Sequence, residues 1–158
     1  MARGLASGLL IMPSKKCEDM KTESLDSRDT TPTEPTAILV VEDEPHSRLG
    51  LGALLAARGF CVETAADVPE AIRHLKARRF AGAIIDIRLP DVHEVTVTGW
   101  DVADICRTFT PEMGLLFVSA QGGPEVEARA GSMGRAAFLE KPIDSARLAA
   151  SLGRLGLP

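Results

Sequence analysis

Short apolar runs that alternate with helical patterns constrain the fold of this chain more than any other feature of its sequence. The run Ala37–Val41 is continuous and rich in β-branched residues, which is typical of a strand buried on both faces of a sheet. Four more strands are expected further along the chain, at residues 60–64, 81–85, 115–118 and 136–139. Strands that alternate with helices predict a parallel sheet with helices on both faces.

Helix start and stop signals lie between the expected strands. Pro45 stands where the first turn of a helix tolerates proline, and Gly59 is suited to end that helix. Asp67 is a candidate N-cap for the second helix. The spacing of apolar residues predicts the remaining helices over residues 102–109, 124–133 and 143–155.

The first 36 residues differ in character from the rest of the chain. They lack helical or strand periodicity, and from Ser14 to Thr36 they are rich in Ser, Thr, Asp, Glu, Lys and Pro. Such a segment buries too little apolar surface to offset the entropy that is lost on ordering. We therefore expect a disordered N-terminal tail over residues 1–36 and one folded domain over residues 37–158.

The charge and hydropathy of the chain argue against several classes of partner. The formal net charge is −4 and no basic block stands out, so nothing in the sequence favours direct DNA binding. No apolar run approaches the roughly 20 residues that cross a bilayer. We therefore expect a cytoplasmic protein that binds neither DNA nor a membrane.

Polar residues that suit phosphate chemistry follow the expected strands. In parallel sheets of this kind, ligands bind beyond the carboxyl ends of the strands, where the strand order switches. Acidic, hydroxyl and basic side chains occur at these ends: Glu42, Asp43 and Glu44 after the first strand, Asp86 after the third, Ser119 after the fourth and Lys141 after the fifth. Each of them alone is common in a solvated loop, but their shared edge favours a functional site.

This set of side chains suits a Mg²⁺-dependent phosphoryl transfer. Clustered carboxylates repel and raise one another's pKa, and a divalent cation relieves that repulsion. Oxygen ligands with positions left for water suit Mg²⁺ best. A carboxylate beside the ion can act as a nucleophile toward phosphorus, while cations, a hydroxyl and backbone N–H groups hold the equatorial oxygens.

Four segments resemble the motifs of a response-regulator receiver domain of the CheY-like, stand-alone type. They are the acidic segment Ile38–Pro45, the phosphoacceptor segment Ile84–Asp91, the switch-hydroxyl segment Phe117–Ala120 and the lysine–proline segment Phe138–Asp144. The resemblance covers residues 36–155. The four motifs indicate this family strongly in combination, whereas each one alone is weak evidence. It implies a flavodoxin-like fold, which is a doubly wound α/β sheet of five parallel strands in the order 2-1-3-4-5 with helices on both faces.

The resemblance also implies roles for the site residues. Asp86 is implied to accept a phosphoryl group from a sensor histidine kinase or a histidine phosphotransfer protein. Glu42, Asp43, Asp86 and the backbone carbonyl of Arg88 are implied to hold the Mg²⁺ ion. Glu44 is interpreted as a charge in the first helical turn rather than as a ligand.

The same resemblance implies how the protein responds. Ser119 is expected to hydrogen-bond the phosphoryl group, Lys141 to pair with it, and the Lys141–Pro142 bond to be cis. Phe138 stands at the position of the family's rotating aromatic, and a static core ring is the alternative. The protein is then a signalling phosphoacceptor that catalyses its own phosphotransfer and dephosphorylation, rather than an enzyme. Phosphorylation is expected to change the conformation of the domain, and this change passes the signal to a partner protein that the sequence does not identify. A homodimer is compatible with this function.

One departure from the family lies beside Asp86. Residues 91–98 lengthen this loop by about five residues before Gly99, a change that loops tolerate at low cost. We interpret the insertion as a harmless bulge or, alternatively, as a partner-specific lid. Arg88 and Gln121 are expected to flank the attacking water and to affect hydrolysis.

Two other functions fit parts of the sequence. A haloacid-dehalogenase-like phosphatase also forms an aspartyl phosphate on an α/β sheet, but its nucleophile normally follows the first strand in an Asp-x-Asp pair, whereas Asp86 follows the third. A degenerate receiver would act as a phosphorylation-independent protein-binding module. Retention of all the acidic, hydroxyl and lysine side chains of the site argues against a degenerate receiver.

Overall fold

The computed structural model describes residues 34–158. The predicted disordered tail, residues 1–36, lies outside the described part except for residues 34–36, which form neither helix nor strand. The boundary between tail and domain therefore stays a prediction. Within residues 34–158, no helix combines the length and the hydropathy that a membrane span needs.

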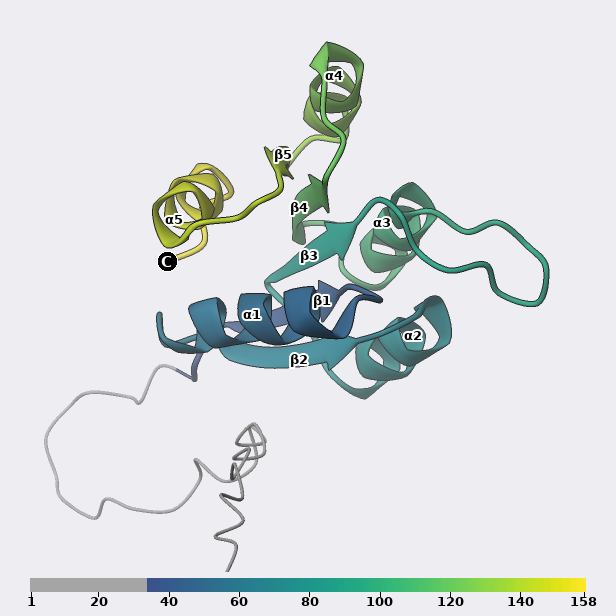
Figure 1. Ribbon diagram of the computed structural model, residues 1–158. Helices are drawn as coiled ribbons and strands as arrows, with labels where there is room; N and C mark the ends of the chain where they lie inside the picture. Colours follow the sequence, from purple (N-terminus) through teal and green to yellow (C-terminus); the bar gives the residue numbers. More distant parts are fainter. Residues whose placement is uncertain (1–33) are drawn as a thin grey trace, which may run out of the picture. The chain divides into compact units, whose positions relative to one another are not determined.

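Five parallel strands form one sheet in the order β2-β1-β3-β4-β5 within the described part of the chain (Figure 1). The strands are β1 (Ala37–Val41), β2 (Cys61–Ala65), β3 (Gly82–Asp86), β4 (Gly114–Ser119) and β5 (Ala136–Glu140). The helices that alternate with them are α1 (Pro45–Ala56), α2 (Val68–Ala77), α3 (Gly99–Phe109), α4 (Pro124–Ser132) and α5 (Ser145–Arg154). This order confirms the flavodoxin-like, doubly wound sheet that the sequence predicts, with its switch in strand order between β1 and β3.

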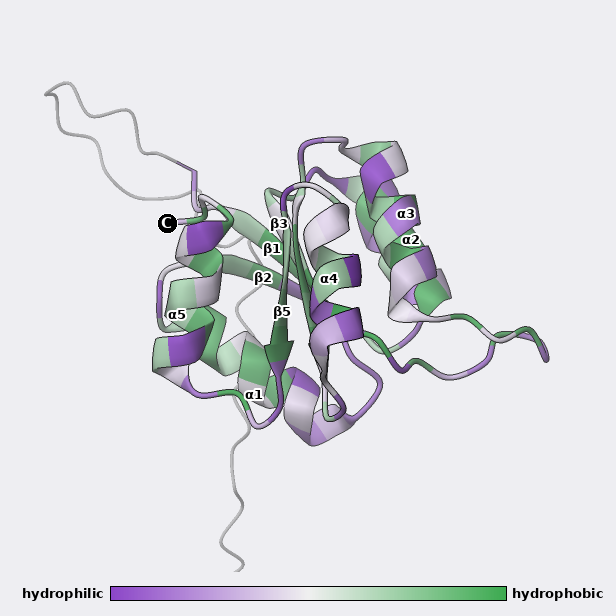
Figure 2. Cartoon of the chain, turned by 90° about the horizontal axis from the view of Figure 1, so that it is seen from above, coloured by the Kyte–Doolittle hydropathy of each residue, from purple (hydrophilic) through white to green (hydrophobic). Residues whose placement is uncertain are grey.

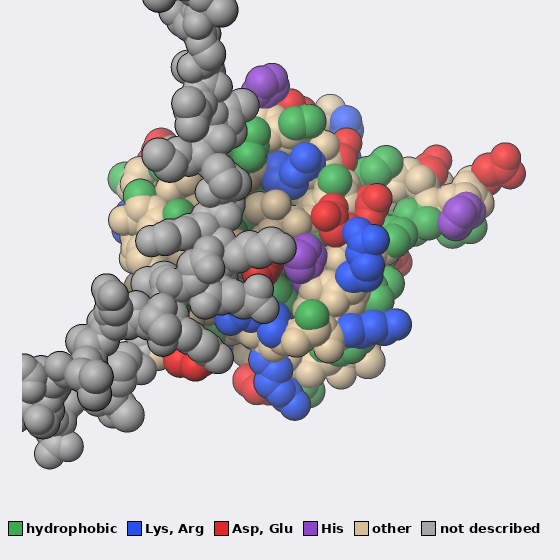
Figure 3. All heavy atoms as spheres, turned by 90° about the horizontal axis from the view of Figure 1, so that it is seen from below, with side chains coloured by type: hydrophobic (Ala, Val, Ile, Leu, Met, Phe, Trp, Pro, Cys, Tyr) green, Lys and Arg blue, Asp and Glu red, His purple; other side chains and the backbone are tan. Residues whose placement is uncertain are grey.

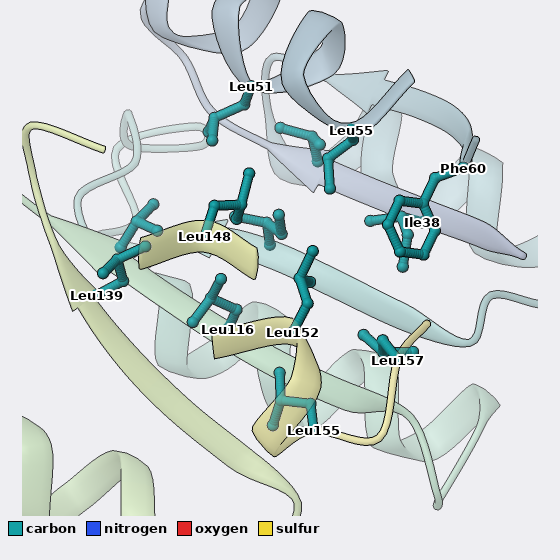
Figure 4. Packing of buried hydrophobic residues seen from close by; sticks show 13 residues of the cluster. Ile38, Leu51, Leu55, Phe60, Leu116, Leu139, Leu148, Leu152, Leu155 and Leu157 are labelled. Atoms are coloured by element: carbon teal, nitrogen blue, oxygen red, sulfur yellow. The ribbon is translucent and has the colours of Figure 1, made fainter. Parts of the chain in front are cut away.

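Helices cover both faces of the sheet, with α1 and α5 on one face and α2, α3 and α4 on the other (Figures 1 and 2). Both β1 and β3 are buried along their whole length, as expected for strands that are covered on both sides. Leucines of α1 and α5 pack with apolar strand residues into one cluster (Figure 4). Its members include Ile38, Leu51, Leu55, Ile84, Leu116, Leu139, Leu148 and Leu152. This cluster fixes the strands whose ends carry the candidate site.

On the other face, the single tryptophan of the chain links three elements. The Trp100 ring on α3 lies 4.3 Å from the Phe117 ring on β4, measured between centroids. The guanidinium carbon of Arg129 on α4 lies 4.3 Å from the centroid of the Trp100 ring, which is a cation–π distance. Ala130 is the buried residue of α4. A small apolar area and this cation–π contact therefore hold α4 in place.

The helix boundaries follow the side chains that cap them. Asp67 caps α2, as predicted, by accepting a hydrogen bond at 2.8 Å from the backbone N–H three residues later. The last helix begins at Ser145, whereas the apolar spacing predicts a start at Ile143. Asp144 accepts a hydrogen bond from the Arg147 N–H at 2.8 Å, so the helix starts after this N-cap and Ile143 belongs to the preceding turn.

Candidate functional site

The register of the sheet places Glu42 beside Asp86. Val41 pairs with Ile85 in the parallel ladder between β1 and β3, so the residues that follow them lie next to each other at the carboxyl edge. The strands β4 and β5 run parallel to these two and end at the same edge. The pair therefore occupies the switch point of the strand order, where sheets of this kind bind ligands.

Three carboxylates gather at this point. One oxygen from each of Glu42, Asp43 and Asp86 lies within 4.8 Å of the others. Glu42 is 1% exposed and Asp86 is 6% exposed, whereas Asp43 faces solvent. Carboxylate oxygens are the hard ligands that Mg²⁺ prefers, and the exposed side leaves room for the water that this ion keeps. The donor set fits the predicted Mg²⁺, and the Arg88 carbonyl as a further ligand stays a prediction.

Lys141 reaches both buried carboxylates. Its Nζ lies 2.6 Å from Glu42 Oε2 and 2.7 Å from Asp86 Oδ2. Burial raises the pKa of Glu42, and the hydrogen bond from Lys141 offsets only part of that effect. Burial alone would lower the pKa of Lys141, but hydrogen bonds to Asp86 and Glu42 more than offset it and raise the pKa. The ammonium is therefore the counter-charge of the two carboxylates.

We expect Lys141→Met to destabilise the metal-free protein and to increase its stabilisation by Mg²⁺. The change leaves the buried Glu42 and Asp86 carboxylates without a counter-charge, which lowers the free energy of unfolding by about 1–3 kcal/mol. Urea unfolding in EDTA and in Mg²⁺ measures both effects, with Lys76→Met at an exposed position of α2 as the control. Equal stabilisation of wild type and variant by Mg²⁺ would show that another group supplies the counter-charge.

Asp86 is held through its backbone as well as through its carboxylate. Its Oδ1 accepts a hydrogen bond from the Arg88 N–H at 2.8 Å. A Cβ added at Gly99 would lie 2.3 Å from the Asp86 carbonyl oxygen, so the start of α3 approaches this strand end at a distance that only glycine allows. In the sequence, Gly99 stands out only as the end of the insertion. The signal for its role is a glycine inside the first turn of a helix, where this residue is otherwise unfavourable.

Ser119 is buried at the end of β4. Its hydroxyl oxygen accepts a hydrogen bond from the Gln121 N–H at 3.2 Å, and its carbonyl oxygen accepts one from the Lys141 N–H at 2.9 Å. The second bond ties the ends of β4 and β5 together. A hydroxyl that accepts one hydrogen bond retains its own proton, which the predicted contact with a phosphoryl oxygen requires.

Phe138 packs on the loop that follows β4. The side chain is half-buried, and its Cε1 lies 2.8 Å from the position that a Cβ on Gly122 would occupy. The ring therefore lies directly against the backbone of Gly122, two residues after the start of this loop. The ring lies at the rim of the core, and both its rotation on phosphorylation and the alternative of a static core ring stay predictions.

Glu44 caps α1 and lies outside the carboxylate cluster. Its side chain accepts hydrogen bonds from the N–H groups of Ser47 at 2.6 Å and His46 at 3.0 Å. These bonds, the one from Ser47 first, lower the pKa of Glu44. The geometry agrees with the interpretation of Glu44 as a charge in the first helical turn.

Two further expectations concern the loops around the site. The Lys141–Pro142 peptide bond is cis, as predicted. The Arg88 guanidinium donates a hydrogen bond to the side-chain oxygen of Gln121, so the loops after β3 and β4 are linked to each other. The two residues that are expected to affect hydrolysis are thus in direct contact.

The chain is similar in sequence to known response regulators. The family model of the response regulator receiver domain matches residues 38–153. The photosynthetic apparatus regulatory protein RegA of Cereibacter sphaeroides is 32% identical over 108 residues, which are 68% of this chain and 55% of RegA. The acid tolerance regulatory protein ActR of Rhizobium meliloti is 30% identical over 116 residues, which are 73% of this chain and 57% of ActR. The chain thus spans somewhat more than half the length of these relatives.

Solved structures share the fold. The chemotaxis protein CheY4 of Vibrio cholerae matches with a TM-score of 0.67 and 26% identity, over 77% of this chain and 98% of CheY4. A response regulator receiver protein from Sinorhizobium medicae matches with a TM-score of 0.65 and 29% identity, over 77% of this chain and 94% of that chain. The family model covers most of the described residues, and the protein therefore belongs to the response regulator receiver domain family of two-component systems.

Proposed function

We propose that this protein accepts a phosphoryl group on Asp86 from a phosphohistidine of a sensor histidine kinase or a histidine phosphotransfer protein. The observation that carries the proposal is the surroundings of the Asp86 carboxylate. One oxygen is bound by the Arg88 N–H and the other by Lys141, next to the carboxylates of Glu42 and Asp43. A nucleophile, a cation and a candidate Mg²⁺ site thus share one edge of the sheet.

The transfer is a displacement at phosphorus. A carboxylate oxygen of Asp86 attacks, a new O–P bond forms, and the P–N bond to the donor imidazole breaks, so the imidazole leaves with the electron pair of that bond. Bound Mg²⁺ supplies positive charge that offsets the repulsion between carboxylate and phosphoryl oxygens. Lys141 can exchange its contact with Asp86 for one with a phosphoryl oxygen. The Ser119 hydroxyl can donate a hydrogen bond to another phosphoryl oxygen.

The response of the domain begins, in this proposal, at Ser119. Its hydroxyl is bound by the Gln121 N–H, so a shift of Ser119 toward the phosphoryl group pulls on the loop after β4. Phe138 packs against that loop at Gly122. The loop leads into α4, whose one buried residue is Ala130. A helix with one buried residue that follows a displaced loop is suited to change its position on phosphorylation.

The phosphohistidine-bearing partner docks, in the same proposal, in an apolar groove beside the acceptor. The groove has a volume of about 810 Å³ and is lined by Leu51 and Leu54 of α1, by Pro142 and Ile143, and by Lys141. The last of these residues is the one that contacts Asp86. A protein that covers this groove brings its own surface to the edge of the sheet where the histidine must arrive.

Chemical phosphorylation of the full chain tests the proposal. Wild type incubated with Mg²⁺ and acetyl phosphate should gain the mass of one phosphoryl group, and neutral hydroxylamine should remove it, because an acyl phosphate reacts with this nucleophile. A sample without donor is the control. A folded protein that gains no mass under these conditions would instead be the phosphorylation-independent binding module.

A further inference from the structure

The segment that interrupts the family pattern is an antiparallel hairpin. Arg88 bridges Thr98, and Val92 bridges Val95 through backbone hydrogen bonds of 2.9 and 3.0 Å. The two residues between these valines, His93 and Glu94, have φ values of 50° and 64°. Positive φ at both central residues is the signature of a type I′ turn, the connection that suits the twist of a two-stranded hairpin. We call residues 88–98 the acceptor hairpin.

Both ends of the acceptor hairpin are fixed at the phosphoacceptor. Its first residue, Arg88, donates its N–H to Asp86 Oδ1 at 2.8 Å. At its other end, the N–H and the hydroxyl of Thr98 each bind Asp101 Oδ2 at 2.8 Å, which caps α3. The following residue, Gly99, lies against the backbone of Asp86. The base of the hairpin therefore has a fixed position relative to the reacting carboxylate.

The tip of the acceptor hairpin projects away from the domain. The ribbon views show it extending beyond α3, and the space-filling view shows an arm that carries apolar, acidic and histidine side chains (Figures 1, 2 and 3). Four residues lie between Arg88 and the turn residue His93, which corresponds to a reach of roughly 15 Å for an extended strand. Val95 is 61% exposed, and the acidic hairpin residues Asp91 and Glu94 are exposed as well.

Two exposed apolar side chains lie on segments that follow the strands of the site. Among the described residues, Leu49 at 60% and Val95 at 61% are the large hydrophobic side chains that face solvent. Leu49 lies on α1, which starts directly after the Glu42–Glu44 segment on one face of the sheet. Val95 lies on the hairpin that starts directly after Asp86 and leads into α3 on the other face. A single protein that covers the carboxyl edge of the sheet at Asp86 can contact both of these segments.

We infer that the acceptor hairpin is a docking element for the phosphohistidine-bearing protein that delivers the phosphoryl group. The inference rests on the proposed function. A histidine side chain is much shorter than the reach of the hairpin, so a donor whose imidazole meets Asp86 brings its surface alongside the hairpin. The surface that fits Val95, Asp91 and Glu94 is an apolar patch flanked by basic side chains. A donor as small as acetyl phosphate cannot reach the tip of the hairpin from the acceptor.

The test measures phosphoryl transfer from a protein donor and from acetyl phosphate, in wild type and in variants of the hairpin. Val95→Asp should reduce the rate of transfer from the phosphorylated kinase or phosphotransfer protein that reacts fastest with wild type by about tenfold or more, and should leave the acetyl phosphate rate within about twofold. Ala128→Asp adds the same charge at an exposed position of α4 and is the matched control. A second variant, His93→Asn, keeps the type I′ turn and the Glu94 side chain, and should transfer at nearly the wild-type rate.

Three outcomes would overturn the inference. Unchanged protein-donor rates in Val95→Asp would show that the hairpin does not dock the donor. An equal loss with both donors would show that it acts on the acceptor site itself, as a lid. Labelling of wild type by acetyl phosphate without transfer from any tested kinase or phosphotransfer protein would also contradict it. If acetyl phosphate does not label wild type at all, the proposed function fails instead.

Discussion

Asp86→Asn is expected to abolish phosphorylation of the protein and to leave its fold intact. A carboxamide is a poor nucleophile and cannot carry a stable acyl phosphate. The asparagine oxygen can still accept the hydrogen bond from the Arg88 N–H, which is 2.8 Å long in the wild type. Lys141 keeps its 2.6 Å contact with Glu42, so the remaining buried carboxylate is still neutralised. Intact-mass measurement after incubation with Mg²⁺ and acetyl phosphate should show no phosphoryl group on the variant.

Asp91→Asn is the matched control for this experiment. Asp91 is an exposed acidic residue of the acceptor hairpin and lies outside the carboxylate cluster. The control should gain one phosphoryl group, as wild type does. Urea unfolding should show that both variants retain a cooperative transition. Full labelling of Asp86→Asn at another residue would refute the assignment of the acceptor.

Removal of Mg²⁺ with EDTA is expected to stop phosphorylation of the wild type. Glu42, Asp43 and Asp86 offer oxygens within 4.8 Å of one another, and Lys141 neutralises only part of their charge. An approaching phosphoryl group is itself negatively charged, so the site needs a further cation. Mass measurement in Mg²⁺ and in EDTA, with the same donor, checks this expectation. Undiminished labelling in EDTA would refute the role of the metal.

A pair of neighbouring substitutions distinguishes a metal ligand from a general charge effect. Asp43→Asn replaces a charged oxygen ligand with a weaker, neutral amide oxygen and should raise the Mg²⁺ concentration needed for half-maximal labelling at least about tenfold. Glu44→Gln removes the same charge one residue later, but from a side chain that caps α1. Its amide oxygen can still accept the capping bonds, so its Mg²⁺ dependence should resemble that of wild type. Equal shifts in both variants would indicate a purely electrostatic effect.

The positions of most site residues follow from the sequence because parallel strands present their carboxyl ends at one edge. The apolar runs identify β1 and β3, and Glu42 and Asp43 follow the first of these strands while Asp86 ends the second. The structure brings these carboxylates together as expected. The helix caps are less predictable. The expected start of α5 at Ile143 is wrong because a local hydrogen bond to Asp144, and not the apolar spacing, decides where that helix begins.

The acceptor hairpin is a part of the domain that local sequence patterns do not predict. The turn residues His93 and Glu94 adopt positive φ although neither is the glycine or asparagine that normally marks a type I′ turn. The sequence therefore contains no turn signal for this hairpin, and the interpretation of residues 91–98 as a bulge or a lid stays a prediction. The hairpin closes because both of its ends are held, at Arg88 by Asp86 and at Thr98 by the capping of α3. These are contacts between elements, which a local pattern does not contain.

By itself, the sequence determined the strands, the helices between them and the edge of the sheet at which the polar residues meet. It could do so because buried strands need continuous apolar runs and because parallel strands need helical crossovers. Only the tertiary structure decided that one ammonium, Lys141 Nζ, lies within 2.7 Å of both Glu42 and Asp86. Only it decided that the start of α3 needs a glycine against the Asp86 backbone. Both arrangements join residues that are distant in the chain, and their geometry depends on how the strands and helices pack.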